Sequence, residues 1–307
     1  MRRREFIGIL GATALSPLAA LAQQSPKPVV GFLNVGRADT SAYLQNAFRA
    51  GLKEAGYIDG ESVAVEYRWA DGHFDRLPSL AADFVHRQVT VIAATTTPGA
   101  LAAKNTGTTI PIVFETAGDP IRLGLVKSLN HPGDNVTGVT QLSSELISKR
   151  LGLLHELAPA AKMVGLLVDQ ADPRAEAQVA DMNEAARGLD LQIQIVNASN
   201  EDEIDKAFAT ISQVGARGLL VGTGEILRRR AEQVVGLAAQ QNCPRSTNIV
   251  SSRRSGGLIS YGTDLIDSYR QAGVYTGRVL KGLAISPSCK RPNLIWSSIS
   301  RQQKRSA

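Results

Sequence analysis

The sequence predicts an α/β protein built from two doubly wound parallel-sheet lobes. Short apolar runs alternate with longer amphipathic segments from residue 28 to residue 280, which is the pattern of βαβ units in a parallel sheet. The alternation falls into two successive series of similar length, and right-handed crossovers turn each series into a three-layer lobe. The chain length of 307 residues also suits two medium lobes better than one hydrophobic core.

The first series begins with a continuous apolar run at 28–34, which is typical of a strand buried on both faces. A helix over 41–56 follows, because Phe48 and Leu52 share one face and Gly56 ends the pattern. The same reasoning predicts further helices over 74–88 and 120–129 and one that begins at 98, with strands over 63–67, 89–94, 110–115 and 136–142.

The second series begins with a helix over 144–157, whose Ile147, Leu151 and Leu154 fall on one face. Apolar runs and helical periodicity then alternate to the end of the pattern. They predict strands over 163–169, 191–196, 218–221 and 258–261, and helices over 174–189, 201–214, 225–240 and 264–280. Within the helix predicted over 225–240, the run Arg228-Arg229-Arg230 is interpreted as a solvated face.

Ligands of doubly wound lobes bind at the carboxyl ends of the strands. In this sequence those ends carry small, hydroxyl-bearing or acidic residues, and the candidate ligand-binding residues are Asn34, Thr96, Thr97, Glu115, Asp119, Asp169 and Glu225. Thr96 and Thr97 directly precede a helix that begins at Pro98, so their hydroxyls and the free N–H groups of the helix can hold a carboxylate. Helix capping alone explains Thr97 equally well, and it is an equal alternative for Asp119.

The sequence lacks the motifs of catalysis and of cofactor binding. Its four histidines have no metal-ligand spacing, and its two cysteines leave no cysteine-rich metal site. It has no nucleophile elbow and no phosphate-binding loop, and Gly222-Thr223-Gly224 lacks the third glycine of a dinucleotide fingerprint. We therefore expect no catalytic residue, no metal and no cofactor.

The N-terminus has the pattern of an export signal. A basic start at 1–4 is followed by a short apolar stretch at 7–21, and Ala-Leu-Ala at 20–22 fits cleavage before Gln23. The pair Arg3-Arg4 also fits a twin-arginine signal, with general secretion as the alternative. No uninterrupted apolar run reaches the roughly 20 residues of a membrane span. The sequence therefore predicts a signal peptide at 1–22 and a periplasmic mature protein.

The net charge of +6 does not indicate nucleic-acid binding. The excess of basic residues is concentrated at 1–22, 245–254 and 285–307, and the rest of the chain is mildly acidic. A nucleic-acid partner is therefore not expected.

Several motifs resemble the substrate-binding proteins of ABC transporters, in particular the tryptophan/tyrosine-type family. They include Tyr67-Arg68-Trp69-Ala70, Gly118-Asp119-Pro120, Asn130-x-Pro132-Gly133 and Gly256-Gly-Leu-Ile-Ser-Tyr-Gly262. The resemblance covers residues 1–283. It implies a type I periplasmic-binding fold, with lobe 1 at 27–142, part of 263–283 returning to lobe 1, and lobe 2 at 143–262.

The resemblance also implies a function. Two lobes hinged to each other would close on a small molecule, for which an amino acid or a relative is one option, and a membrane permease of an ABC importer would be the partner. A monomer without enzymatic activity is expected. The competing class is an exported enzyme that uses the cleft between the lobes, with Asp119 or Asp169 in its chemistry. Ligand-dependent closure without turnover would distinguish the two.

Two segments depart from the family pattern. Residues 245–254 read RSTNIVSSRR, without the apolar alternation of a strand. Read in a neighbouring frame with compatible codons, residues 244–255 become PAIYQYREFAAS, and the residues after Ala284 become DLPVLQATKFDLVINLKTAKAL, both of which are similar to the family. We hypothesise a compensated frameshift near 245–254 and an uncompensated one near 284, so that 284–307 is an aberrant tail.

This hypothesis predicts damage to lobe 2. Residues 245–254 and 285–307 are expected to lack regular structure, although flanking strands can force a few residues of the first segment into extended form, and only 294–296 of the tail could form a strand. The C-terminal strand of the family is expected to be missing. Lost apolar burial of roughly 1.5–3 kcal/mol per side chain rivals a typical stability of about 5–15 kcal/mol. The chain is then a weakly folding or non-functional truncated relative, which is a further alternative.

Overall fold

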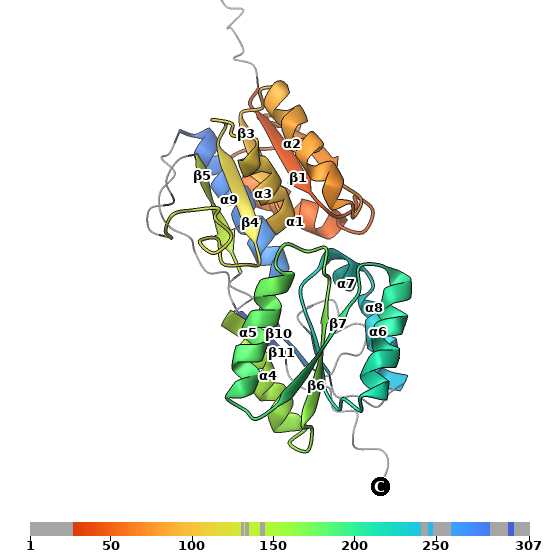
Figure 1. The fold of residues 1–307 in the computed structure, drawn as a ribbon. Coiled ribbons are helices and arrows are strands. Elements are labelled where there is room, and N and C mark those ends of the chain that lie inside the picture. The colour runs from red at the N-terminus through yellow and green to blue at the C-terminus, as the bar shows by residue number, and fades with distance from the viewer. Residues whose placement is uncertain are drawn as a thin grey trace, which may run out of the picture.

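The structure, a computed structural model, describes residues 27–129, 132, 135–141, 145–240, 245–247, 259–282 and 294–297. These residues form two lobes, which stand one above the other in Figure 1, and each lobe is built on one sheet. The strand order is β2-β1-β3-β4-β5 in the first sheet and β11-β10-β9-β8-β6-β7 in the second. Every strand pair is parallel except β10–β11. The predicted fold class is confirmed.

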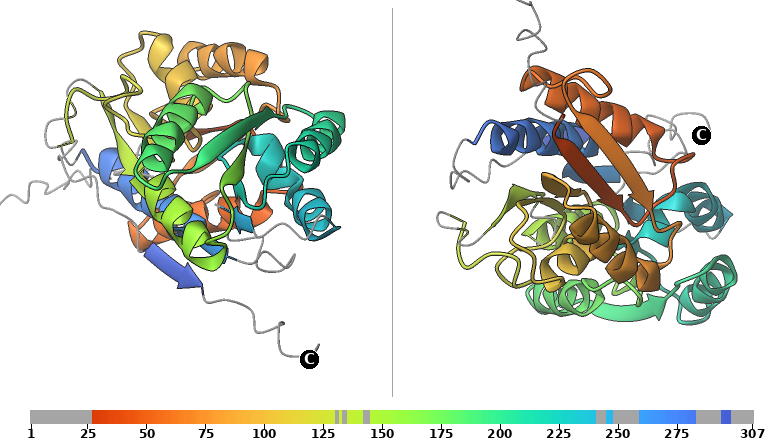
Figure 2. Two further views of the ribbon diagram at one scale, coloured as in Figure 1. Left: turned by 60° about the horizontal axis from the view of Figure 1, so that its bottom comes forward. Right: turned by 90° about the horizontal axis from the view of Figure 1, so that it is seen from above.

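The first lobe contains the elements of the first series and one late helix. Its strands are β1 (Val29–Asn34), β2 (Ala64–Trp69), β3 (Val91–Ala94), β4 (Ile112–Thr116) and β5 (Val136–Thr140). Its helices are α1 (Ala42–Glu54), the 3₁₀ turn η2 (Phe74–Arg76), α2 (Leu77–His86), α3 (Thr97–Asn105) and α9 (Leu265–Leu280). The right-hand view of Figure 2 shows α9 lying beside α1, although the whole second series separates the two helices in sequence.

The second lobe contains the remaining elements. Its strands are β6 (Met163–Val168), β7 (Gln192–Asn197), β8 (Leu219–Val221), β9 (Arg245–Thr247), β10 (Ile259–Thr263) and β11 (Leu294–Ser297). Its helices are α4 (Glu145–Leu157), α5 (Ala175–Arg187), α6 (Glu201–Gln213), α7 (Glu225–Arg229) and α8 (Ala231–Gln240).

Apolar side chains cover both faces of each sheet, as the apolar strand runs predict. In lobe 1, α2 and α3 pack on one face, and α1 and α9 pack on the other through Phe48 and Tyr275. Phe32 on β1 contacts the ring of Phe48, and its ring centroid lies 5.4 Å from that of Trp69. In lobe 2, α4 and α5 cover one face, and α6, α7 and α8 cover the other.

Two glycines allow α1 and α9 to approach unusually closely. A Cβ atom on Gly51 would lie 1.8 Å from the carbonyl oxygen of Arg270, and one on Gly273 would lie 2.1 Å from that of Phe48. Any larger residue at either position would push the helices apart. The glycines therefore fix α9 in lobe 1, which places its buried Tyr269 against the other elements of that lobe.

The helix expected at 120–129 is absent, and this prediction was wrong. The carboxylate of Asp119 accepts a hydrogen bond from the N–H of Ile121 at 2.8 Å, which resembles a helix start. However, Gly124 adopts a left-handed φ of 66°, and the N–H of Leu125 closes a turn onto Pro120. Leu125 and Val126 are then buried in the lobe 1 core. The demand for this burial overrides the local helix signal.

The helix expected over 225–240 is split. α7 ends at Arg229, Arg230 has φ −99° and ψ 25°, and α8 begins at Ala231. The break lets Leu227 on α7 and Val234 on α8 enter the same core cluster from two directions.

Two short strands lie in the segments that were expected to be irregular. Arg245–Thr247 forms β9 between β8 and β10, because backbone groups of both neighbours pair with it whatever its side chains are. Leu294–Ser297 forms β11, antiparallel to β10, and it includes 294–296, the stretch of the tail that was expected to be able to form a strand. The other residues of 245–254 and 285–307, and the predicted signal at 1–22, lie outside the described residues. No helix in the described part of the chain is long and apolar enough to cross a membrane.

Candidate ligand-binding site

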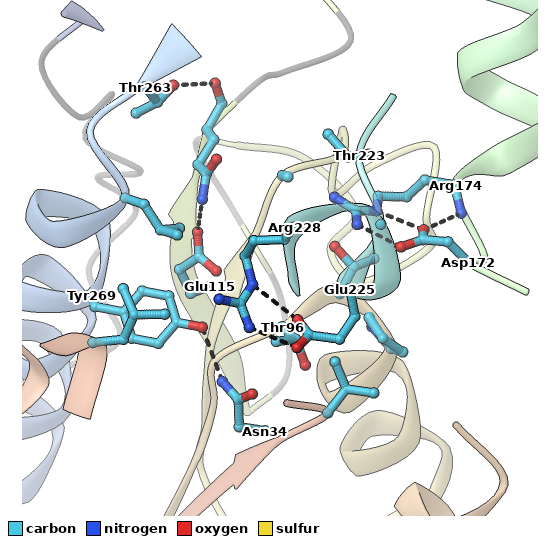
Figure 3. A pocket seen from close by; sticks show the side chains of 18 of the residues that line it. Asn34, Thr96, Glu115, Asp172, Arg174, Thr223, Glu225, Arg228, Thr263 and Tyr269 are labelled. Atoms are coloured by element: carbon cyan, nitrogen blue, oxygen red, sulfur yellow. Dashed lines mark hydrogen bonds and ion pairs between the residues drawn. The ribbon is translucent and has the colours of Figure 1, made fainter. Parts of the chain in front are cut away.

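A cavity of about 470 Å³ lies where the two lobes meet. Lobe 1 contributes the ends of β1 and β4 and the first turns of α1, α3 and α9, and lobe 2 contributes residues near 172–174 and 222–228 (Figure 3). Of the residues predicted from the sequence, Asn34, Thr96, Thr97, Glu115 and Glu225 line this cavity.

The other two predicted residues lie elsewhere. Asp119 lines a neighbouring cavity of about 360 Å³, which shares Arg174 with the first cavity. Asp169 lines neither cavity and is 2% exposed. It lies behind Gly224, where a Cβ atom would be 2.6 Å from the Asp169 Cβ, and its carboxylate accepts a hydrogen bond from Ser199 at 3.0 Å. Burial raises the pKa of this carboxyl group. The structure therefore does not bring all seven residues together.

A buried hydrogen-bond network fixes the lobe 1 side of the cavity. The Asn34 amide donates to the hydroxyls of Thr95 and Tyr269, both at 2.9 Å, and its oxygen accepts from the N–H of Gly36 at 2.7 Å. The Tyr269 hydroxyl donates to the Thr95 carbonyl at 2.6 Å. Burial raises the pKa of Tyr269 far above its ordinary value, so the residue stays neutral. Asn34 and Tyr269 are thus held rigidly at the cavity wall.

The two threonines occupy the start of α3. Thr96 is the N-cap residue, and its hydroxyl accepts a hydrogen bond from the N–H of Gly99 at 3.3 Å. The Thr97 hydroxyl lies 2.6 Å from that of Thr116 on β4. The N–H of Thr97 belongs to the first turn, where backbone donors have no partner within the helix. The helix start therefore presents neutral and partly positive donors to the cavity.

Glu115 on β4 and Asp172 are the most deeply buried carboxylates of the cavity, each with 3% of the residue exposed. The side-chain amide of Gln141 donates a hydrogen bond to Glu115. Burial raises the pKa of Glu115 to about 7, although the Gln141 hydrogen bond and the more distant charge of Arg174 lower it. A carboxyl group in this state gains considerably from a cation that enters the cavity.

Two arginines of lobe 2 are engaged by carboxylates beside them. Arg174 donates to both oxygens of Asp172, at 2.7 and 2.6 Å. Arg228 donates to both oxygens of Glu225, at 3.0 and 2.6 Å, and its Nη2 lies 3.5 Å from the Ser41 hydroxyl of lobe 1. Burial alone would lower the pKa of Arg228, but the charge of Glu225 raises it above its ordinary value. The interpretation of Arg228 as solvated was wrong.

Several lining residues were not found in the sequence. Arg228 lies three residues after Glu225, a spacing that predicts an ion pair on a helix and could have indicated it. Tyr269 lies in α9, an amphipathic helix at the end of the second series, and nothing in the sequence around it indicates that it lines the cavity. The apolar part of the lining comes from Val35, Tyr43, Leu44, Pro98, Leu265 and Ile266.

Comparison with known proteins supports this description. The chain matches the family model for ABC transporter substrate binding proteins over residues 37–288. It is 29% identical over 242 residues to the tyrosine-binding protein of Clostridioides difficile strain R20291, covering 78% of this chain and 69% of that protein.

Solved structures show the same fold. A conserved domain protein from Vibrio cholerae superposes with a TM-score of 0.79 at 23% identity, covering 88% of this chain and 92% of that one. The ABC domain in complex with L-Trp from Streptococcus pneumonia superposes with a TM-score of 0.76 at 22% identity, covering 89% and 90% of the two chains.

The two sheets and the cavity between them define a two-lobed binding protein with the type I periplasmic-binding fold. The chain belongs to the family of ABC transporter substrate-binding proteins. The family and the relatives are substrate-binding proteins rather than enzymes, which confirms the predicted family and argues against the exported enzyme.

Proposed function

We propose that this chain is the exported solute-binding component of an ABC importer, which captures an amino acid or an aromatic relative between its lobes and presents it to a membrane permease. The observation that carries the proposal is the cavity at the lobe boundary, which is lined by both polar and apolar residues. The tyrosine-binding relative and the structure that holds L-Trp support this ligand class.

The polar and the apolar lining residues suit the carboxylate and the side chain of such a ligand, respectively. The start of α3, with Thr96 and Thr97, would receive the carboxylate. Tyr43, Leu265 and Ile266 would pack against the side chain, and two of them are substantially exposed without ligand, Tyr43 at 42% and Ile266 at 51%. Covering such exposed apolar surface favours binding.

Contacts between the lobes give the protein a way to signal that it is loaded. Arg122 of lobe 1 forms an ion pair with Asp181 of lobe 2 at 2.9 Å. The Thr263 hydroxyl donates to the Gln141 carbonyl at 3.0 Å, which joins two of the segments that connect the lobes. A ligand that contacts both lobes would favour the closed arrangement, and the permease would recognise that arrangement.

Calorimetric titration of the mature chain with the amino acids and with aromatic acids tests the proposal. We expect micromolar or tighter binding of at least one aromatic amino acid, a smaller radius of gyration in the loaded protein, and recovery of the ligand unchanged. Failure of every compound to bind, or conversion of a compound, would contradict it.

We further propose a periplasmic, monomeric protein whose lobe 1 comprises 27–142 with part of 263–283, and whose lobe 2 comprises 143–262. Replacing Arg3 and Arg4 by Lys should abolish export if the twin-arginine route is used. The mature N-terminus should be Gln23. Undiminished export of the variant would leave general secretion as the route.

A further inference from the structure

The charges that line the cavity are unequal in number. The lining contains two arginines, Arg174 and Arg228, but four carboxylate residues, which are Glu115, Asp172, Glu225 and Asp264. The asymmetry indicates that the cavity favours a positive ligand group, provided that the arginines are already satisfied.

Both arginines are satisfied. Arg174 is held by Asp172, and Arg228 is held by Glu225, each through two hydrogen bonds to the two oxygens of one carboxylate. In both pairs the side chains are mostly buried, with 14% and 2% exposed in the first pair and 18% and 9% in the second. Breaking a buried pair leaves its carboxylate uncompensated. Each guanidinium therefore has its charge balanced by one carboxylate, although the N–H groups that these hydrogen bonds do not use can still donate to a ligand.

The two remaining carboxylates differ in what they bind. Asp264 caps α9 by accepting hydrogen bonds from the N–H groups of Ile266 and Asp267. Glu115 accepts a hydrogen bond from the neutral amide of Gln141, and no cation of the described residues forms an ion pair with it. Among the described residues, Glu115 is thus the cavity carboxylate that has neither a cationic partner nor a role in capping a helix.

We infer that this cavity recognises its ligand by an ammonium group placed against Glu115, so that apolar amines without a carboxylate belong to its ligand class together with amino acids. The inference rests on the proposed function and deepens it, because it states which charge of the ligand is required. A ligand carboxylate would meet the neutral donors at Thr96, Thr97 and the start of α3, and two guanidinium groups whose charges Asp172 and Glu225 already balance, so it is dispensable.

The surroundings of Glu115 agree with this role. The charged and titratable groups that act on or are influenced by it are Arg174, which precedes α5, and Tyr269 on α9. Tyr269 stays neutral, and Arg174 is shared with Asp172. Burial raises the pKa of Glu115 to about 7, and an ammonium group would restore its charged form.

The test compares matched ligands. Tyrosine, tyramine and 3-(4-hydroxyphenyl)propionate share one ring, as do tryptophan, tryptamine and indole-3-propionate, and each set contains the zwitterion, the amine and the acid. Titration at pH 8 should give each amine an affinity within about tenfold of its amino acid, and the acid an affinity about 100-fold weaker, because charged hydrogen bonds of buried groups have this magnitude.

Variants assign the effect to one side chain. Glu115→Gln keeps the shape and a hydrogen bond to Gln141, and should weaken the amines and amino acids by about 10- to 100-fold while the acids are unchanged. Glu115→Asp keeps the charge and should retain the preference for amines over acids. Glu232→Gln, on the exposed surface of α8, is the matched control and should change nothing.

The outcomes separate the inference from the proposed function. If amino acids bind but the amines do not, or if Glu115→Gln binds all of them as the wild type does, the inference is wrong and the proposed function stands. If the amines bind and the amino acids do not, the inference stands and the amino-acid ligand is wrong. Binding of the acids as tightly as the amines, or binding of none of the six compounds, overturns the inference, and the proposed function is then decided by the titration with the full set of amino acids and aromatic acids.

Discussion

The central strands β4 and β9 occupy the same place in the two lobes but have very different sequences. β4 pairs with β3 and β5, and β9 pairs with β8 and β10, so each is the fourth strand from the outer edge formed by β2 or β7. β4 reads IVFET and is buried along its whole length, whereas β9 reads RST. Backbone pairing is therefore kept in β9 without the apolar residues that normally accompany a central parallel strand.

The difference shows that neighbouring strands can impose an extended backbone on a segment that contributes little of its own. The backbones of β8 and β10 form hydrogen bonds with the backbone of β9, and these bonds do not depend on which side chains β9 carries. The apolar contribution of such a strand depends on its sequence. The hypothesised frameshift near 245–254 would explain why β9 is polar, and the re-read sequence would restore aromatic and β-branched residues there.

The largest effect should come from repairing both segments. Replacing 245–255 and the residues after Ala284 by their re-read sequences should stabilise the chain by about 5 kcal/mol or more, since each restored buried apolar side chain contributes about 1.5–3 kcal/mol. Ligand affinity should rise as well. Urea unfolding and titration of the wild-type and repaired chains measure both. A wild-type chain that is as stable and binds as tightly would show that neither segment is damaged.

Removing an apolar side chain from β4 should make this strand more like β9, which has none. Phe114→Ala removes a side chain that is 2% exposed in the lobe 1 core, and should cost about 3–5 kcal/mol of unfolding free energy. Urea unfolding followed by circular dichroism measures the loss. Ile58→Ala, at an exposed apolar side chain, is a control expected to change stability by less than about 1 kcal/mol. If Phe114→Ala lowers the unfolding free energy by less than about 1 kcal/mol, the buried side chains of β4 do not stabilise lobe 1 as argued.

Glu115 on β4 should make stability depend on pH. Its pKa is about 7 in the folded protein against an ordinary value of 4.5, so the folded state binds more protons between these values. Stability should therefore fall as pH rises from about 4.5 through 7, by about 3 kcal/mol in the absence of ligand. Glu115→Gln should remove this part of the dependence. Urea unfolding at pH 5 and pH 8 measures it, and an equal slope in the two proteins would refute the expectation.

The smallest effect concerns the start of α3. Thr97→Val should weaken ligand binding by about 1–3 kcal/mol if the hydroxyl bonds a buried ligand group. Thr116→Val is the comparison variant, because it removes the same hydroxyl–hydroxyl hydrogen bond from the side that does not line the cavity, together with the hydrogen bond from the N–H of Gly118. Titration of both variants with the ligand decides whether the Thr97 hydroxyl contacts the ligand or has only a structural role. Equal losses, or none, would favour a purely structural role for Thr97.

Much of the fold was predictable because most of the strands contain an apolar run and most helices carry regular periodicity. The prediction failed where tertiary burial decided the outcome, as in the turn at Gly124 that takes Leu125 into the core. Asp119 followed by Pro120 is a convincing helix start locally, yet it caps a turn.

Prediction of the cavity was limited by long-range geometry. Strand ends indicated Asn34 and Glu115, because parallel strands end at one edge of a sheet. Asp169 also ends a strand, but its carboxylate turns toward Ser199 and lies behind Gly224. Tyr269 reaches the cavity because α9 packs on α1, which no pattern in its own segment encodes.

The close contact of α1 with α9 has a consequence for the order in which the protein can be made. Residues 42–54 leave the ribosome long before residues 265–280, and until the latter arrive one face of the first sheet lacks a covering helix. The N-terminal lobe therefore completes its core only after β6 to β10 of the second lobe have been synthesised. During that interval the exposed surface around Gly51 would be open to chaperones, and a fragment that stops before residue 265 would remain an unfinished lobe.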